Sequence, residues 1–268
     1  MNNKSEKELL FAGIDIGSMT TKCVITDNAN IVGSIMVPTK SDPKGSGIEA
    51  LESLLNKTGI KRSDILRIVG TGYGRISLDI FDHTATELTC HAAGARYLNP
   101  HVEGLIDIGG QDSKVIKLKQ DGSIMDFVLN DRCAAGTGHF LEVMAKTLNQ
   151  DIQTFGDLYV KSAGPSTINS TCTVFAESEV ISLVAKGESK TDIAAGLHQS
   201  IAKRIGNMAR RLGLKENVAF VGGVAKNRGM RKALEDYLGI SFIPISQDPQ
   251  ITGALGAAVM AKEISEKK

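Results

Sequence analysis

The sequence predicts an α/β fold of two related lobes, and three observations support this fold class. Three apolar runs end in glycine: LLFAGIDIG at 9–17, GLIDIGG at 104–110 and NVAFVGG at 217–223. Segments with apolar residues at helical spacing lie between them, as in α/β proteins. The pattern of FAGIDIGSMTTKCVITDNANIVGSIM also recurs as GLIDIGGQDSKVIKLKQDGSIM. A recurrence after about 90 residues is too long for a solenoid repeat and predicts a duplicated lobe.

The first lobe is expected to comprise residues 1–103 and to begin with a three-stranded meander. Its strands are predicted at 9–17, 18–27 and 31–37, with DNAN as the second turn. The loop 38–47 should lead into a helix at 48–57, which Gly59 ends. A strand at 65–69, the glycine-rich turn GTGYGR and a helix at 84–98 complete this lobe.

The second lobe, expected at 104–250, repeats the strand, turn, strand order and then becomes helical. The predicted helices span 138–148, 152–162, 174–185 and 191–212, and 165–173 is predicted to be a polar loop. The run NVAFVGGVAKN reads as a third strand and glycine turn that enter a helix. The closing helical segment, 251–268, is expected to return to the first lobe.

The composition limits the classes of partner. The chain has 268 residues, 42% hydrophobic content and a net charge of +1. This length and composition allow a large core, and the charge balance favours neither nucleic acid nor an anionic membrane as partner. No apolar run approaches the roughly 20 residues of a membrane span, and the first residues lack a secretory pattern. A cytoplasmic protein without membrane or nucleic-acid partners is therefore expected.

The acidic glycine turns indicate nucleotide chemistry. Glycine lets backbone amides approach phosphate oxygens, and three such turns in order are a stronger signal than one. Asp15 and Asp107 end the first two apolar runs, where they could hold the waters of a phosphate-bound Mg²⁺. Two such meanders imply a nucleotide held between the lobes.

The four cysteines divide into two kinds. Cys23 lies in an apolar strand and Cys90 in a small-residue helix, so both are expected to be core thiols. Cys133 and Cys172 lie in polar loops that lead into helices, where a thiolate is stabilised. Too few cysteines are present for a disulfide framework, and none forms a CxxC pair. Glu87 and His91, one helical turn apart, could form a metal pair, although an ordinary helix pair is favoured.

The motifs resemble those of a known superfamily. DIGSMTTK, DIGGQDSK and FVGGVAKN look like the two phosphate segments and the adenosine segment of the ATPases that include actin, sugar kinases and heat-shock chaperones. NDRCAAGTGHF and NSTCTVFAESEV are similar to the two cysteine motifs of the activators of 2-hydroxyacyl-CoA dehydratases, a family that includes benzoyl-CoA reductase subunits. This resemblance covers nearly the whole chain.

The resemblance implies a fold and a set of cofactors. The fold is a two-lobed actin-like ATPase with duplicated ribonuclease-H-like subdomains, and the cofactors are ATP or ADP, Mg²⁺ and one [4Fe–4S] cluster per homodimer. Cys133 and Cys172 of each subunit would ligate the cluster. The cysteine number agrees, because a cubane commonly takes four thiolates and a two-fold dimer doubles two to four.

The expected site residues follow from the same motifs. Gln111 and Asp112 are candidates to orient or activate the attacking water. Gly136, Thr137 and Gly138 are interpreted as a nucleotide contact, with helix capping by Thr137 as a by-product; capping alone and packing room for the cluster are the alternatives. The full set expected to bind nucleotide is Asp15, Gly17, Ser18, Thr20, Thr21, Lys22, Asp107, Gly109, Gly110, Gln111, Gly136, Thr137, Gly138, Gly222, Gly223 and Lys226, with Asp15 and Asp107 also serving Mg²⁺.

The function expected from the resemblance is an oxygen-sensitive, ATP-driven reductase that passes single electrons. Ferredoxin or flavodoxin would be the donor, and an iron–sulfur dehydratase, reductase or double-cubane protein the acceptor. A small-molecule kinase with structural cysteines is the alternative, and Asp112 could serve as its catalytic aspartate. A non-catalytic nucleotide sensor or chaperone-like protein is a third possibility.

Overall fold

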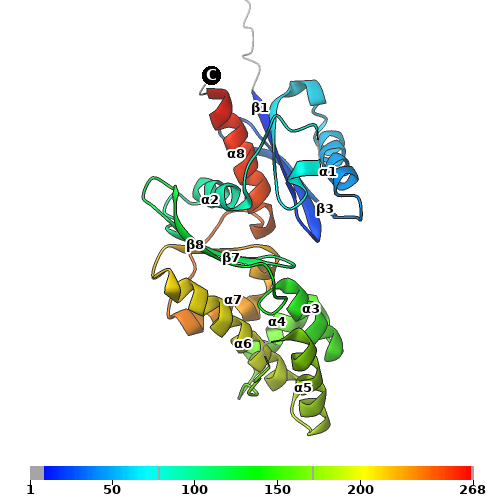
Figure 1. Cartoon of the computed structure of the whole chain (residues 1–268), viewed down its shortest axis with the longest axis vertical. Helices are drawn as coiled ribbons and strands as arrows, with labels where there is room; N and C mark the ends of the chain where they lie inside the picture. The colour runs from blue at the N-terminus through cyan, green and yellow to red at the C-terminus, as the bar shows by residue number, and fades with distance from the viewer. Residues whose placement is uncertain (1–8, 78, 171, 267–268) are drawn as a thin grey trace, which may run out of the picture. The chain divides into compact units, whose positions relative to one another are not determined.

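The computed structural model describes residues 9–77, 79–170 and 172–266. These residues form two compact units (Figure 1). Unit 1 comprises the described residues up to Pro100 and those from Ser246 onward, and unit 2 runs from His101 to Ile245. None of the helices in the described ranges is long and apolar enough to cross a membrane.

Unit 1 contains a five-stranded sheet in the order β3-β2-β1-β4-β5. Its strands are β1 (Leu10–Ile16), β2 (Thr20–Thr26), β3 (Ile31–Pro38), β4 (Ile65–Thr71) and β5 (His83–Thr84). The first three strands pair antiparallel as a meander, and β4 pairs parallel with β1. The predicted meander is confirmed.

Helices cover both faces of this sheet. Helix α1 (Pro43–Thr58) packs on the face that carries Ala12, Ile14 and Ile16. Helices α2 (Glu87–Leu98) and α8 (Thr252–Glu266) belong to the opposite face, where Phe11 meets Ala257 and Ala261. Figure 1 shows α8 running alongside β1. Alternating side chains of β1 thus pack into two apolar layers, one on each face of the sheet.

Two predicted boundaries in unit 1 are wrong. Helix α1 begins at Pro43 inside the predicted loop 38–47, because Pro43 occupies the first helical turn, where proline is well tolerated. Helix α2 begins at Glu87 instead of 84, because Thr84 belongs to β5 and Thr86 accepts the Thr89 amide as the N-cap.

Unit 2 repeats the strand arrangement of unit 1. Its sheet has the order β8-β7-β6-β9 and consists of β6 (Gly104–Ile108), β7 (Ser113–Leu118), β8 (Ile124–Asn130) and β9 (Val218–Val221). Again three strands form an antiparallel meander, and the last strand pairs parallel with the first of the three. The duplication predicted from the recurring IDIG pattern is confirmed.

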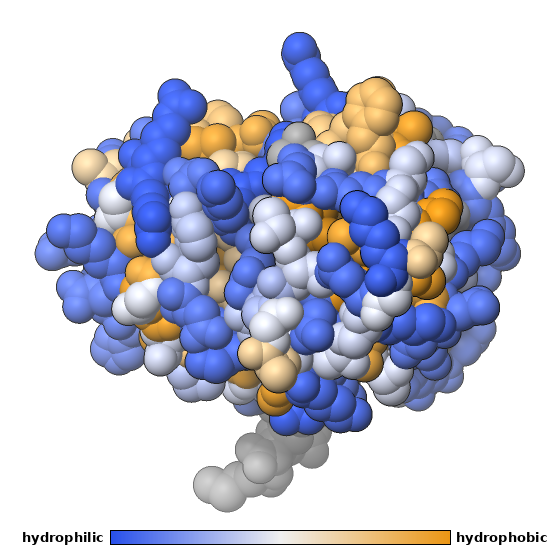
Figure 2. Space-filling model, turned by 90° about the horizontal axis from the view of Figure 1, so that it is seen from below, coloured by the Kyte–Doolittle hydropathy of each residue, from blue (hydrophilic) through white to orange (hydrophobic). Residues whose placement is uncertain are grey.

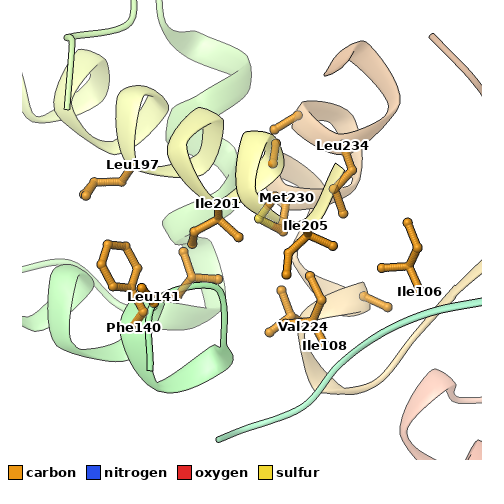
Figure 3. Packing of buried hydrophobic residues seen from close by; sticks show 14 of the residues in the cluster. Ile106, Ile108, Phe140, Leu141, Leu197, Ile201, Ile205, Val224, Met230 and Leu234 are labelled. Carbon is orange, nitrogen blue, oxygen red and sulfur yellow. The ribbon is translucent and has the colours of Figure 1, made fainter. Parts of the chain in front are cut away.

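The helices of unit 2 gather on one apolar layer. They are α3 (Gly138–Thr147), α4 (Ile152–Lys161), α5 (Thr173–Ala185), α6 (Lys190–Arg211) and α7 (Arg228–Leu238). Figure 3 shows side chains of α3, α6 and α7, among them Phe140, Ile201 and Leu234, meeting Ile106 and Ile108 of β6. This continuous core supports the loops that carry Cys133 and Cys172.

Candidate functional site

The two acidic turns have the same backbone structure. In unit 1 the Gly17 amide donates to the Thr20 carbonyl at 3.1 Å, and in unit 2 the Gly109 amide donates to the Asp112 carbonyl at 2.9 Å. Each turn joins the first two strands of its meander. The sequence duplication therefore extends to the conformation of the turn itself.

An aspartate and a lysine face each other across the strands at each turn. Lys22 Nζ lies 3.4 Å from Asp15 Oδ2, and Lys114 Nζ lies 3.3 Å from Asp107 Oδ2. Both aspartates are buried, as is Lys114. Lys114 also contacts Asp112 Oδ2 at 2.5 Å. The sequence interpretation missed Lys114, although it occupies the position of Lys22 in the duplicated motif.

A glycine with positive φ packs against each aspartate. Gly72 has φ 86° and Gly222 has φ 84°. A Cβ atom at Gly72 would lie 2.5 Å from Asp15 Oδ1, and one at Gly222 would lie 2.3 Å from Asp107 Oδ1. Only glycine fits both the conformation and the space. Gly222 was predicted as a site residue, whereas Gly72 was missed because GTGYGR does not resemble VGGVAK in letters.

The remaining predicted phosphate residues differ in their surroundings. Ser18, Gln111 and Lys226 are exposed, and Gly223 begins a short 3₁₀ turn to Lys226. Thr21 is buried, and its hydroxyl lies 2.9 Å from that of Thr39. Side chains alternate along a strand, so Thr21 and Lys22 point to opposite faces of the sheet. Thr21 therefore supports the turn from the face opposite Asp15.

His91 lies close to Asp15 in unit 1. Its Nδ1 lies 2.8 Å from the Glu87 carbonyl oxygen, and a Cβ added to Gly253 would lie within 3.3 Å of His91 Nε2 and 3.1 Å of Asp15 Oδ2. The backbone contact matches the helix-pair interpretation of Glu87 and His91. Within the described residues, no three His, Cys, Asp or Glu side chains come together as ligands for a metal ion.

The loop that carries Cys133 is held by side chains from two other segments. The Asn130 amide donates to the carbonyls of Cys133 and Ala135 at 3.1 and 3.0 Å. Arg204 donates to Asn130 Oδ1 at 3.2 Å, which fixes the orientation of the amide. The sequence interpretation missed Asn130 and Arg204, because the partners are up to 74 residues apart.

The same loop is joined to the phosphate turn of unit 2. Ser113 Oγ donates to the Gly136 carbonyl. The amides of Gly138 and His139 donate to the carbonyls of Gly109 and Gly110 at 2.8 and 2.9 Å. The predicted hairpin between Asp112 and Cys133 is present as β7 and β8, and these hydrogen bonds close it into one connected structure.

The predicted capping role of Thr137 is wrong. Thr137 occupies the N-cap position of α3, but its side chain makes no capping hydrogen bond. Its hydroxyl donates instead to the Ala134 carbonyl at 2.7 Å. The first amides of α3 donate to carbonyls of the phosphate turn and do not need the Thr137 hydroxyl. Thr137 instead stabilises the loop after Cys133.

Cys172 is placed differently from Cys133. Cys172 is exposed and is the N-cap residue of α5, with its side chain free of any capping hydrogen bond. Cys133 is half-buried and precedes the first residue of α3 by a short loop. The amides at the start of α5 can therefore stabilise negative charge on the Cys172 sulfur directly, whereas at Cys133 this role falls to backbone groups of the loop.

Cys23 and Cys90 are confirmed as core thiols. Both are fully buried, and burial raises the pKa of each thiol to about 12. They are protonated at neutral pH and are poor metal ligands and nucleophiles. Cys133 and Cys172 are thus the accessible thiols of the chain.

Apolar side chains are exposed along the helix that follows Cys172. Val174 and Phe175 are each 67% exposed, and Ile181 and Val184 are also exposed. Figure 2 views the protein from the end at which α5 lies in Figure 1 and shows several hydrophobic patches among polar residues. Clustered exposed apolar residues are typical of surfaces that another protein covers.

Each unit has a meander followed by a parallel strand, and the glycine after that strand lies beside the acidic turn. This duplicated arrangement defines a two-lobed ATPase of the actin-like fold. Over residues 12–261 the chain matches, and belongs to, the BadF/BadG/BcrA/BcrD ATPase family. Membership of an ATPase family implies ATP or ADP with Mg²⁺ as the bound nucleotide.

Relatives with assigned roles match almost end to end. The chain is 45% identical to a 2-hydroxyisocaproyl-CoA dehydratase activator of Clostridioides difficile, over 93% of each chain. It is 45% identical to an (R)-2-hydroxyglutaryl-CoA dehydratase activating ATPase of Acidaminococcus fermentans, over 95% of this chain and 98% of the relative. A solved structure of the Clostridium difficile activator with bound ADPNP superposes with a TM-score of 0.90 and 43% identity, over 97% of this chain and 98% of that one.

Proposed function

We propose that this protein is an ATP-dependent reductase that delivers single low-potential electrons to a partner iron–sulfur enzyme. A 2-hydroxyacyl-CoA dehydratase is the acceptor that the relatives favour, since both relatives named above activate such enzymes. A reductase or a double-cubane protein would use the same delivery chemistry. The electron donor would be a ferredoxin or a flavodoxin. The relatives favour this function over a small-molecule kinase.

The observation that carries the proposal is the pair of accessible cysteines. Cys133 and Cys172 are reachable from solvent, and the other two thiols are buried in a protonated state. A [4Fe–4S] cluster commonly takes four thiolates. Two copies of the chain supply four, so the residues fit one cluster shared by a homodimer. The exposed apolar face of α5, which starts at Cys172, supports a partner protein next to this position.

A bound cluster would supply a carrier of one electron at low potential. The chain's own residues would hold it and adjust its surroundings. The backbone amides at the start of α5 favour negative charge at Cys172. Asn130, oriented by Arg204, holds the carbonyls of Cys133 and Ala135 in place. Hydrogen bonds and fixed charges near a metal centre are the usual means by which a protein adjusts a potential.

The phosphate turns would bind ATP and convey its state to the cysteine loop. Asp15 and Asp107 would hold Mg²⁺ through water, and Gln111 or Asp112 would orient the attacking water. A shift of the turn at Gly109 and Gly110 would be passed on to Gly138 and His139, because their amides are bonded to the carbonyls of the turn. Ser113 supplies the third connection, to Gly136.

The coupling is tested by the reduction potential of the anaerobic protein and its affinity for the acceptor. Each is measured with ADP and with a non-hydrolysable ATP analogue. The proposal predicts that at least one quantity differs between the two nucleotides and that exposure to air strips the iron. Identical potentials together with identical affinities would refute ATP-dependent delivery.

A further inference from the structure

The polypeptide just before Cys172 has no regular secondary structure. Residues 163–170 form neither helix nor strand. Backbone groups in such a loop need other partners if the loop is to keep one conformation. A cysteine that binds a metal must return to the same position in every molecule. Contacts to this loop therefore determine how well Cys172 is placed.

The start of the loop is fixed by α6. Ser162 Oγ donates to Asp192 Oδ1 at 2.6 Å, and the Ser166 amide donates to the Asp192 carbonyl at 2.9 Å. Ile168 then packs against the core of unit 2. These contacts hold the part of the loop that is distant from Cys172.

The end of the loop is fixed by a single side chain, Glu179 of α5. Its Oε1 accepts the Asn169 amide at 3.0 Å and the Asn169 side-chain amide at 3.1 Å. Its Oε2 accepts the Ser170 amide at 2.8 Å. Three donors thus use both oxygens of one carboxylate, and hydrogen bonds to an ionised acceptor are stronger than neutral ones.

The carboxylate serves these donors in its charged form. Burial raises the pKa of Glu179, but the backbone hydrogen bonds from Asn169 and Ser170, together with those from their side chains, lower it by more. The net pKa lies below the usual value for a glutamate.

We propose that Glu179 is the positioning residue for Cys172. Helix α5 fixes Cys172 from the C-terminal side, since the Ala176 amide donates to the Cys172 carbonyl. Glu179, from the same helix, fixes the chain from the N-terminal side. Glu179 therefore ties Asn169 and Ser170 to the helix that begins directly after Cys172. This role rests on the proposed function of Cys172 as a ligand of the shared cluster.

Glu177 provides a matched control on the same helix. Its side chain is exposed and accepts a hydrogen bond from Thr147 Oγ1 at 3.3 Å, and it makes no hydrogen bond to residues 163–170. Glu177→Gln and Glu179→Gln remove the same charge from α5. A difference between the two variants thus reports on the contacts of Glu179 and not on the charge of the helix.

The first measurement is amide hydrogen exchange of the metal-free protein. In Glu179→Gln one oxygen acceptor becomes a donor, so the amides of Asn169 and Ser170 should exchange at least about tenfold faster, equivalent to about 1.4 kcal/mol. Glu177→Gln should change this exchange less than twofold. Equal exchange in both variants and the parent protein would overturn the anchoring role. This measurement needs no bound iron.

The second measurement is the rate at which the reconstituted dimer loses iron to a chelator. The electron paramagnetic resonance spectrum of the reduced protein is recorded in parallel. Glu179→Gln should lose iron at least about tenfold faster and change the spectrum, whereas Glu177→Gln should match the parent protein. Faster exchange with unchanged iron loss and spectrum would overturn the positioning role. A parent protein that binds no iron would instead overturn the proposed function, so the two failures are distinguishable.

Discussion

Removing the positive charge of Lys114 is expected to destabilise unit 2 strongly. The substitution Lys114→Met keeps most of the apolar stem and deletes the ammonium group. Asp107, whose side chain is 4% exposed, then loses the cation 3.3 Å from its Oδ2. Deleting one partner of a buried ion pair costs about 3–5 kcal/mol, because the remaining charge stays desolvated.

The duplicated unit provides an internal comparison for this value. Lys22 makes the corresponding pair with Asp15 at 3.4 Å, and its side chain is 13% exposed against 7% for Lys114. Lys114 additionally contacts Asp112, which is 33% exposed. A partly exposed pair adds about 1 kcal/mol at most. Lys114→Met should therefore cost up to about 1 kcal/mol more than Lys22→Met.

Native-state hydrogen exchange measures the effect in each unit separately, since it reports local free energies of opening. Peptides from β6 and β7 report Lys114→Met, and peptides from β1 and β2 report Lys22→Met. Adding Asp107→Asn to Lys114→Met should recover about 2 kcal/mol, because it removes the buried charge that Lys114 had paired. A loss below about 1 kcal/mol for Lys114→Met, or no recovery in the double variant, would refute the buried-pair argument.

Three further predictions concern other parts of the chain. Gly72→Ala should weaken ATP binding by at least about tenfold in a titration, since positive φ costs about 1–3 kcal/mol for alanine and the methyl group displaces Asp15; unchanged affinity would contradict the role assigned to Gly72. In the metal-free native protein, an alkylating reagent should modify Cys133 and Cys172 but not the two thiols whose pKa is about 12, and modification of Cys23 before unfolding would contradict their core placement. Burial lowers the pKa of His198, so the unfolded state binds the extra proton as pH falls through about 6.5. The free energy of unfolding should therefore decrease by up to about 1.4 kcal/mol per pH unit as the pH falls, and His198→Phe should flatten that slope in urea titrations. An unchanged slope would contradict the assignment of this pH dependence to His198.

Local sequence patterns were sufficient for the meanders and their turns. Apolar runs that end in acid and glycine specify a buried strand and its exit, and the recurring IDIG pattern predicted two equivalent units. The burial of Cys23 and Cys90 was also predictable, because their neighbours in sequence are apolar or small. The start of α1 differs from the prediction because glycine and proline usually indicate a loop, whereas Pro43 opens the helix.

Contacts between distant segments were beyond sequence reasoning. Arg204 reaches Asn130 from another helix, and Glu179 holds a loop that precedes its own helix. No spacing rule links such residues. Thr137 stands at the N-cap position, which favours threonine, yet the first amides of α3 donate to carbonyls of the phosphate turn. Only the tertiary structure brings this turn to the start of α3. Gly72 was missed because its segment, GTGYGR, does not resemble VGGVAK in letters, although in both a glycine follows a strand.

The most direct test is the iron and sulfide content of the anaerobically reconstituted protein, measured together with its mass in solution. We predict four irons per dimer in the parent protein, from one [4Fe–4S] cluster with two cysteines per chain. Cys133→Ala and Cys172→Ala should each abolish stable binding, while Cys23→Ala should retain it. Four irons in a monomer, or full retention in Cys172→Ala, would contradict a cluster shared between two copies of the chain.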